Sequence, residues 1–223
     1  MAELFAALDT PDLARAVELA RSLSGVVDGV KLGLEFFLAQ GPAGVAAVAA
    51  AGLPLFLDLK LHDIPNTVAG AVRSLGSLAP SVLTVHAAGG RAMLAAARDA
   101  ASPATRVVGV TVLTSLDRSD LLAAGVAGGP EEQVARLAAL CRDAGVDGVV
   151  CSGAEVARVR TEWTDGVLVV PGLRPEGGEA GDQKRVVTPR AAQELGATVL
   201  VVGRAITGAA DPVQAAREVR RTL

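Results

Sequence analysis

The sequence predicts an α/β protein of the (β/α)8 class, a TIM barrel, formed by a single domain. Eight short apolar segments alternate with Ala-rich amphipathic segments, and this alternation is typical of parallel strands joined by helical crossovers. Polar or turn-forming residues follow nearly every apolar segment, and in a barrel all strand ends meet at one mouth. A doubly wound open sheet is the alternative, but the strand count and the polar ends favour the barrel.

The predicted strands are short runs of β-branched and other apolar residues. They span residues 4–8, 29–32, 53–59, 82–86, 106–113, 148–151, 166–170 and 199–202. In chain order, the residues at their carboxyl ends are Asp9, Lys31, Asp58 with Lys60, His86, Thr114, Ser152, Pro171-Gly172 and Gly203-Arg204. These residues are therefore the first candidates for a functional site.

The predicted helices lie between the strands and after the last one. They span residues 11–23, 35–50, 68–78, 91–101, 131–144, 154–160, 189–195 and 211–221. We expect the first helix to begin at Asp9-Thr10-Pro11, because a capping Asp before a Pro in the first turn favours a helix start. No linker rich in Pro, Gly or Ser divides the chain, so one domain over residues 1–223 is expected.

Composition excludes several classes of protein. With 51% hydrophobic and 20% charged residues, the 223-residue chain can form a large core. Aromatic residues make up only 2% and the net charge is −3, which argues against a nucleic-acid partner. The two cysteines form no CxxC pair, which suits a reducing compartment. The N-terminus has no basic signal-peptide region and no apolar run reaches the roughly 18–20 residues of a membrane span, so we expect a cytoplasmic protein without membrane contact.

A cluster of charges follows the third predicted strand. Asp58 and Lys60 are two residues apart, so their side chains share one face of the strand, and Asp63 follows where the strand should become a loop. Lys31 ends the neighbouring strand and can join them. An alternating set of lysines and carboxylates would hold Lys60 protonated and fixed, which suits a general acid. A structural salt-bridge network at the barrel rim is the alternative.

Two later segments favour phosphate binding. Gly203-Arg204 follows the last strand, where glycine allows close backbone approach and arginine can bind phosphate with two hydrogen bonds. The loop ending in Arg174 follows the seventh strand, and barrels often hold phosphate near strands seven and eight. The Gly-rich segment that follows can be a plain surface loop or a lid that closes Gln183 over a ligand.

Metal and thiol chemistry find little support. His62 is expected to be structural, and His86 is expected to pack or hydrogen-bond at the mouth of the barrel. Neither has a metal-ligand partner at a useful spacing, so no metal site is predicted. Cys151 suits a small core residue better than a nucleophile.

Residues 58–68, Asp-Leu-Lys-Leu-His-Asp-Ile-Pro-Asn-Thr-Val, closely resemble the signature of the orotidine 5'-phosphate decarboxylase family. The resemblance spans the chain and also includes residues 7–9, 30–33, 85–87, 112–115, 171–175, 180–183 and 202–206. It implies a (β/α)8 homodimer that converts orotidine 5'-monophosphate to UMP and CO2 without a metal or organic cofactor.

The same resemblance implies a role for each site residue. Lys31, Asp58 and Lys60 would act from one subunit, while Asp63 and Thr67 would complete the partner's site. Asp9 and Lys31 would hold the ribose, and Thr114 the pyrimidine edge. The phosphate would be bound by Arg174, Gln183, Gly203 and Arg204.

Three other functions compete with this interpretation. A magnesium-dependent decarboxylase or aldolase for sugar phosphates would share Asp-x-Lys-x-x-Asp and a phosphate site, with the carboxylates as metal ligands. The continuation after Asp58-x-Lys60 and the presence of Gln183 favour the pyrimidine nucleotide. A non-catalytic phosphate sensor would have no need for Lys60, and a phosphoribosyl-anthranilate-type isomerase would leave the charged cluster unexplained.

Overall fold

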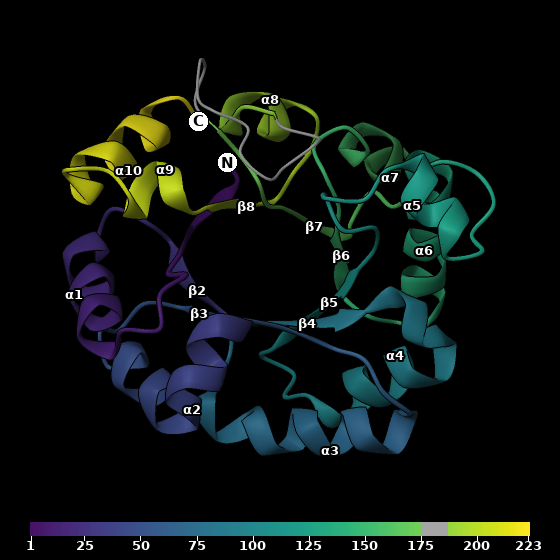
Figure 1. Ribbon diagram of the computed structural model, residues 1–223, viewed down its shortest axis with the longest axis horizontal. Helices are drawn as coiled ribbons and strands as arrows, with labels where there is room; N and C mark the ends of the chain where they lie inside the picture. Colours follow the sequence, from purple (N-terminus) through teal and green to yellow (C-terminus); the bar gives the residue numbers. More distant parts are fainter. Residues whose placement is uncertain (175–186) are drawn as a thin grey trace.

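The protein forms a closed barrel of eight parallel strands, as predicted. The computed structural model describes residues 1–174 and 187–223. Each strand pairs in parallel with the next, and β8 pairs with β1 to close the ring. Figure 1 looks along the barrel, with the ring of strands inside and the helices around it. The fold class expected from the sequence is therefore confirmed.

The strands agree with the predicted segments to within a few residues. They are β1 (Glu3–Ala7), β2 (Gly29–Gly33), β3 (Leu55–Leu61), β4 (Val82–His86), β5 (Arg106–Val110), β6 (Gly148–Val150), β7 (Val167–Val170) and β8 (Val199–Val202). β3 begins two residues later than expected, after Pro54, which has no N–H to donate to a neighbouring strand. β5 was expected to continue to residue 113 but ends at Val110.

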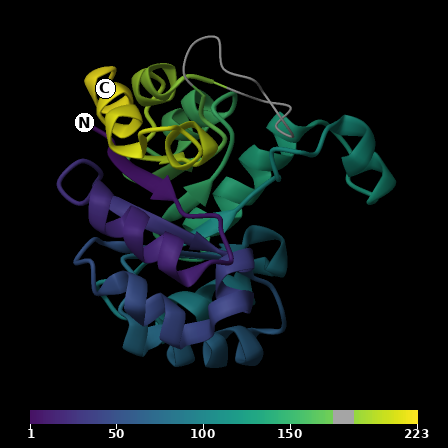
Figure 2. The same cartoon turned by 60° about the vertical axis from the view of Figure 1, so that its left-hand side comes forward.

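The helices lie outside the ring. They are α1 (Leu13–Leu23), α2 (Leu34–Ala49), α3 (Pro65–Leu75), α4 (Gly90–Ala100), α5 (Arg118–Ala123), α6 (Pro130–Asp143), α7 (Val156–Glu162), α8 (Pro189–Glu194), α9 (Arg204–Thr207) and α10 (Pro212–Arg221). Short 3-10 turns, η1 (Gly76–Leu78) and η2 (Ala87–Gly89), flank β4. Neither α5 nor α9 was expected from the sequence, and Figure 2 shows α5 projecting away from the barrel.

The expected start of the first helix is wrong. Asp12, not Asp9, caps α1, and its side chain accepts a hydrogen bond from the Arg15 N–H. Asp9 lies before the helix and accepts a bond from Lys31 instead. The Asp9 carboxylate therefore lies at the mouth of the barrel and not at the start of α1.

Alternate residues of the strands fill the barrel interior. Phe5 and Phe56 meet there edge to face, with ring centroids 5.9 Å apart. Gly29 lies beside this pair, where an added Cβ would come within 2.3 Å of the Phe5 ring. The other face of each strand packs against the helices, and this outer layer holds most of the buried apolar side chains. Substitution of Gly29 would therefore displace the aromatic pair below the mouth.

The base of the barrel is closed by long-range polar contacts. Arg220 of α10 binds both Asp28 oxygens at 2.7 Å, and Asp28 also accepts a bond from the Leu4 N–H. Gln193 of α8 bonds to both ends of the chain, accepting from the Ala2 N–H and donating to the Leu223 carbonyl. The two termini consequently lie close together (Figure 1).

Candidate active site

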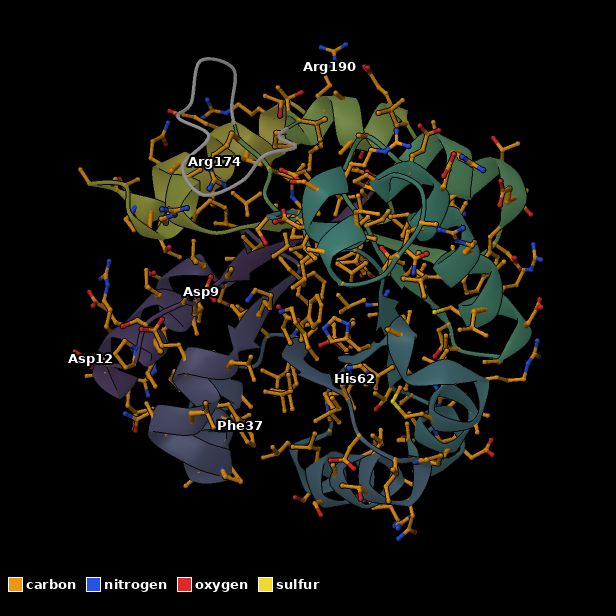
Figure 3. All side chains as sticks on the ribbon, turned by 45° about the vertical axis from the view of Figure 1, so that its right-hand side comes forward. Asp9, Asp12, Phe37, His62, Arg174 and Arg190 are labelled. Carbon is orange, nitrogen blue, oxygen red and sulfur yellow. The ribbon has the colours of Figure 1, made fainter. Side chains whose placement is uncertain are left out.

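A cavity of about 500 Å³ opens at the carboxyl ends of the strands. Its floor is apolar and includes Phe56, Val110 and Val201. Its polar lining comprises Asp9, Lys31, Asp58, Lys60, Thr114, Arg174 and Arg204, with Gly33, Gly172 and Gly203 as backbone positions. Of the residues labelled in Figure 3, Asp9 and Arg174 line this cavity, whereas Arg190 of α8 lies at the periphery. The mouth of the barrel is therefore the candidate active site.

Four side chains form an alternating charge chain along one wall of the cavity. The Lys31 Nζ lies 3.0 Å from Asp9 Oδ1 and 3.5 Å from Asp58 Oδ2. The Lys60 Nζ lies 2.8 Å from the same Asp58 oxygen. The sequence analysis placed Lys31, Asp58 and Lys60 together, and the structure brings them together with Asp9. Each cation in the charge chain thus has a carboxylate partner.

Asp58 lies at the centre of the charge chain and is ionised. Its side chain is only 16% exposed, and burial alone would raise its pKa. The positive charges of Lys31 and Lys60 outweigh that effect, and hydrogen bonds from Lys60 and Thr84 add to them, so the pKa of Asp58 lies below its usual range. The carboxylate consequently holds two ammonium groups at the cavity wall at neutral pH.

Lys60 adopts a backbone conformation that is unusual for a residue with a side chain. Its φ is +50°, in the left-handed region, and the pairing of β3 with β4 changes register between Leu57 and Leu61. The Lys60 N–H donates to the Thr84 hydroxyl at 2.9 Å, and this hydroxyl donates to Asp58 Oδ1 at 3.0 Å. Sequence reasoning missed Thr84, although a polar residue within the apolar strand of residues 82–86 was an available signal.

The lining of the cavity also includes the predicted phosphate-binding residues that the structure describes. Gly203, Arg204 and Arg174 all line it, from the ends of β8 and β7. A Cβ added at Gly203 would lie 3.6 Å from the Ala7 Cβ and 3.8 Å from Asp9 Oδ2, in ordinary van der Waals contact, so the fold accommodates a small side chain there. Thr114 also lines the cavity, although it belongs to a loop and not to the expected strand. Gln183 lies outside the described residues.

Asp63 and Thr67 are positioned differently. Both are exposed, and neither belongs to the described lining of the cavity. Asp63 follows β3 and accepts a hydrogen bond from the Ile64 N–H, and Thr67 lies in the first turn of α3. Ile64, between them in sequence, is 66% exposed. Within one chain, these two residues and the charge chain are therefore not brought into one cavity.

The rings of the two histidines lie close together, tilted by 33° to one another. The His62 and His86 ring centroids are 5.3 Å apart. Burial lowers the pKa of His86, and the neighbouring His62 and Lys60 lower it further, while Asp58 opposes them. His86 is thus neutral at pH 7. Among residues 1–174 and 187–223, no group of three or more His, Cys, Asp or Glu side chains has the geometry to hold a metal ion.

No helix in the described part of the chain is long and apolar enough to cross a membrane.

A closed parallel barrel with a lysine–aspartate charge chain at its mouth defines an enzyme of the (β/α)8 class. Residues 2–219 match the sequence model of the orotidine 5'-phosphate decarboxylase / HUMPS family. The chain belongs to this family.

Several relatives are similar over nearly their whole length. Orotidine 5'-phosphate decarboxylase of Novosphingobium aromaticivorans is 57% identical over 220 residues, which are 99% of this chain and 98% of the relative. The enzyme of the same name from Sphingopyxis alaskensis is 58% identical with the same coverage. The crystal structure of orotidine 5'-phosphate decarboxylase from Lactobacillus acidophilus superposes with a TM-score of 0.84 at 33% identity, covering 100% of this chain and 99% of that one. The resemblance expected from residues 58–68 is confirmed.

Proposed function

We propose that the protein decarboxylates orotidine 5'-monophosphate to UMP and CO2, a step of pyrimidine nucleotide synthesis, with Lys60 as the proton donor. The observation that carries the proposal is the Lys60 ammonium, held 2.8 Å from Asp58 at the wall of a cavity that Arg174, Gly203 and Arg204 also line. The close relatives named orotidine 5'-phosphate decarboxylase support the choice of reaction. We also propose that residues 1–223 act as one domain in the cytoplasm.

The charge chain suits the chemistry of this reaction. When the bond between C6 and the carboxylate breaks, the electron pair stays on C6 in the plane of the ring, where the π system delocalises it poorly. A fixed ammonium beside C6 stabilises this charge as it forms. Lys60 then transfers one proton from Nζ to C6 and regains a proton from solvent. Asp58 keeps the ammonium in place, and Lys31 helps to hold that carboxylate in position.

The remaining cavity residues suit the rest of the substrate. We assign Asp9 and Lys31 to the ribose hydroxyls and Thr114 to the pyrimidine edge. Arg174, Gly203 and Arg204 would bind the phosphate together with Gln183. Because the phosphate is remote from C6, its binding energy can order the site for the chemical step and thereby raise kcat. No metal and no organic cofactor takes part in the proposed reaction.

A second copy of the chain would complete each site. We assign Asp63 to the catalytic set and Thr67 to the substrate-binding set on the resemblance of residues 58–68 alone, and both are exposed and outside the described cavity lining. Exposed apolar side chains near the mouth, such as Ile64 at 66% and Leu34 at 48%, suit an interface between copies. We therefore propose a homodimer in which Asp63 and Thr67 reach into the partner's cavity.

The first test follows the ultraviolet absorbance of orotidine 5'-monophosphate after addition of purified protein, with and without EDTA. We expect rapid conversion to UMP that EDTA does not affect and that Lys60→Ala abolishes. Arg190→Ala is the matched control, because Arg190 lies on the outer surface and pairs with Glu194 of its own helix. If conversion requires magnesium, or if folded protein does not convert the substrate at all, the assignment moves to the magnesium-dependent enzymes that act on sugar phosphates.

The second test addresses the shared site. Lys60→Ala and Asp63→Ala are each expected to be inactive as homodimers. A heterodimer of the two variants contains one intact site, so statistical mixing should restore about one quarter of the wild-type activity. No recovery in a mixture shown to exchange subunits would contradict the shared site.

A further inference from the structure

We infer that Thr84 is a positioning residue that fixes Lys60 for proton transfer. The inference rests on the proposed role of Lys60 and goes beyond it, because Thr84 belongs to neither the charge chain nor the described lining of the cavity. In the described part of the chain, the Thr84 hydroxyl hydrogen-bonds to both the Lys60 backbone and the Asp58 carboxylate, and no other group does so.

The contact geometry assigns the two bonds different tasks. Thr84 is fully buried in β4, with no exposed area. Its oxygen accepts from the Lys60 N–H at 2.9 Å and its proton is donated to Asp58 Oδ1 at 3.0 Å. The other Asp58 oxygen then remains for the two ammonium groups, with Lys60 at 2.8 Å and Lys31 at 3.5 Å. The Thr84 hydroxyl thus orients the Asp58 carboxylate, which holds the Lys60 ammonium, and it also orients the backbone of Lys60 itself.

The backbone at Lys60 needs such support. A side-chain-bearing residue with φ of +50° is strained, and it persists only where its surroundings stabilise it. The register change between β3 and β4 removes Lys60 from regular strand pairing, so its N–H needs another acceptor. The Thr84 hydroxyl supplies that acceptor. Without this hydroxyl, the Lys60 N–H would lose its acceptor. The backbone would then rearrange to find another one, and the Lys60 Cα and Nζ would move with it.

Thr84→Val tests the inference, because valine keeps the shape of threonine and lacks the hydroxyl. We expect kcat to fall about 30- to 100-fold, since displacement by about 1 Å at a reacting group costs about that much. KM should change by less than about threefold, because the proposed phosphate contacts follow β7 and β8, away from Thr84, and Lys31 keeps its partner Asp9. Thr84→Ser keeps the hydroxyl and should retain kcat to within about threefold.

Thr105→Val is the matched control for stability. Thr105 lies just before β5 at the base of the barrel and is 4% exposed, and its hydroxyl donates at 2.8 Å to the Pro80 carbonyl. Both valine variants should lose thermal stability, but Thr105→Val should keep its kcat. Equal kcat in both valine variants, or a Thr84→Ser as slow as Thr84→Val, would overturn the inference.

A crystal structure of Thr84→Val separates this inference from the proposed function. We expect residue 60 to leave the left-handed region and the distance from Lys60 Nζ to Asp58 to lengthen. Retention of the original φ and of the 2.8 Å contact would overturn the inference, whichever reaction the wild-type enzyme catalyses. Failure of the wild-type protein to convert orotidine 5'-monophosphate would instead contradict the proposed function. The φ of residue 60 and the distance from Lys60 Nζ to Asp58 would still decide whether Thr84 positions Lys60.

Discussion

Replacing Asp58 with asparagine removes the charge at the centre of the charge chain and nearly preserves its shape. In the wild type this carboxylate faces the Lys60 Nζ at 2.8 Å and the Lys31 Nζ at 3.5 Å. The Lys31 side chain is only 10% exposed. After the substitution, two ammonium groups would share a neutral neighbour, and only Lys31 would retain a carboxylate partner, Asp9.

The expected loss of stability follows from these distances. With an effective dielectric constant of about 20, the attractions to Lys60 and Lys31 are about 6 and about 5 kcal/mol before desolvation is subtracted. Desolvation of the three groups offsets most of this attraction, and removal of one partner of such a buried pair costs about 3–5 kcal/mol. Lys60 is 29% exposed and can turn toward solvent, so we expect about 3 kcal/mol. For a chain of this length that lowers Tm by about 6–12 °C.

Activity should fall further than stability alone explains. An unrestrained Lys60 ammonium costs about 10²-fold in kcat, because positioning of the donor is lost. The assays are thermal unfolding by calorimetry and steady-state decarboxylation at a temperature where both proteins are folded. Asp28→Asn is the matched control, because Asp28 is likewise paired with a cation, Arg220, but at the base of the barrel. It should lower Tm while leaving kcat unchanged.

One result would refute this reasoning. If Asp58→Asn kept wild-type kcat and Tm, the charge chain would have no role in fixing Lys60. If Asp58→Asn lost as much Tm as Asp28→Asn but kept full activity, the charge chain would be a structural salt-bridge network, the alternative that the sequence also allowed.

Three further predictions follow from other groups. The pKa of Asp58 is lower in the folded protein than its ordinary value of 3.8, so its stabilising effect is present above that value and lost as pH falls through the lowered pKa. The difference in unfolding free energy between wild type and Asp58→Asn should thus be constant from about pH 5 to 8 and shrink below about pH 4; a difference that grows on acidification would contradict the assignment. Gly203→Ala should fold normally but raise KM about tenfold, because its methyl group enters the space through which the backbone approaches the phosphate; unchanged substrate kinetics would argue against a phosphate site there. Burial raises the pKa of the Cys141 thiol to about 12, so mass spectrometry after alkylation at pH 8 should find Cys141 modified only in unfolded protein, and rapid labelling of the native fold would oppose this.

The alternation of strands and helices was predictable because it depends on local periodicity. Strand residues alternate between two faces, so the spacing of Asp58 and Lys60 was sufficient to place their side chains together. β2 and β3 are neighbours in the barrel, so Lys31 on β2 could likewise be expected near Asp58 and Lys60 on β3. These parts of the site depend on sequence distance and on the order of neighbouring strands, which the chain encodes directly.

The conformation of Lys60 was not predictable in the same way. Its left-handed φ arises where β3 changes register against β4, and the bond from Thr84 that accompanies it joins residues 24 positions apart. No local pattern indicates such a contact. The missed helix α5 is different, because Asp117 and Asp120 form a capping box that is visible as a spacing in the sequence.

The start of α1 shows how a distant contact decides between two local signals. Asp9 and Asp12 are both suitable helix caps three residues apart. Lys31 provides an ionic partner for Asp9, and Asp12 caps the helix. A sequence pattern alone cannot assign the two carboxylates, because the partner is on another strand.

The contacts of Gln193 bear on how freely the order of the eight units can be changed. One amide side chain joins the Ala2 N–H to the Leu223 carbonyl at distances of 2.8 and 2.7 Å, at the end of the barrel opposite the charge chain. A short peptide joining the two ends would therefore bridge a gap that is already closed by hydrogen bonds. New termini could then be opened beside α5, which projects from the barrel (Figure 2). Such a circular permutant should retain the ring of strands and the geometry of Lys31, Asp58 and Lys60.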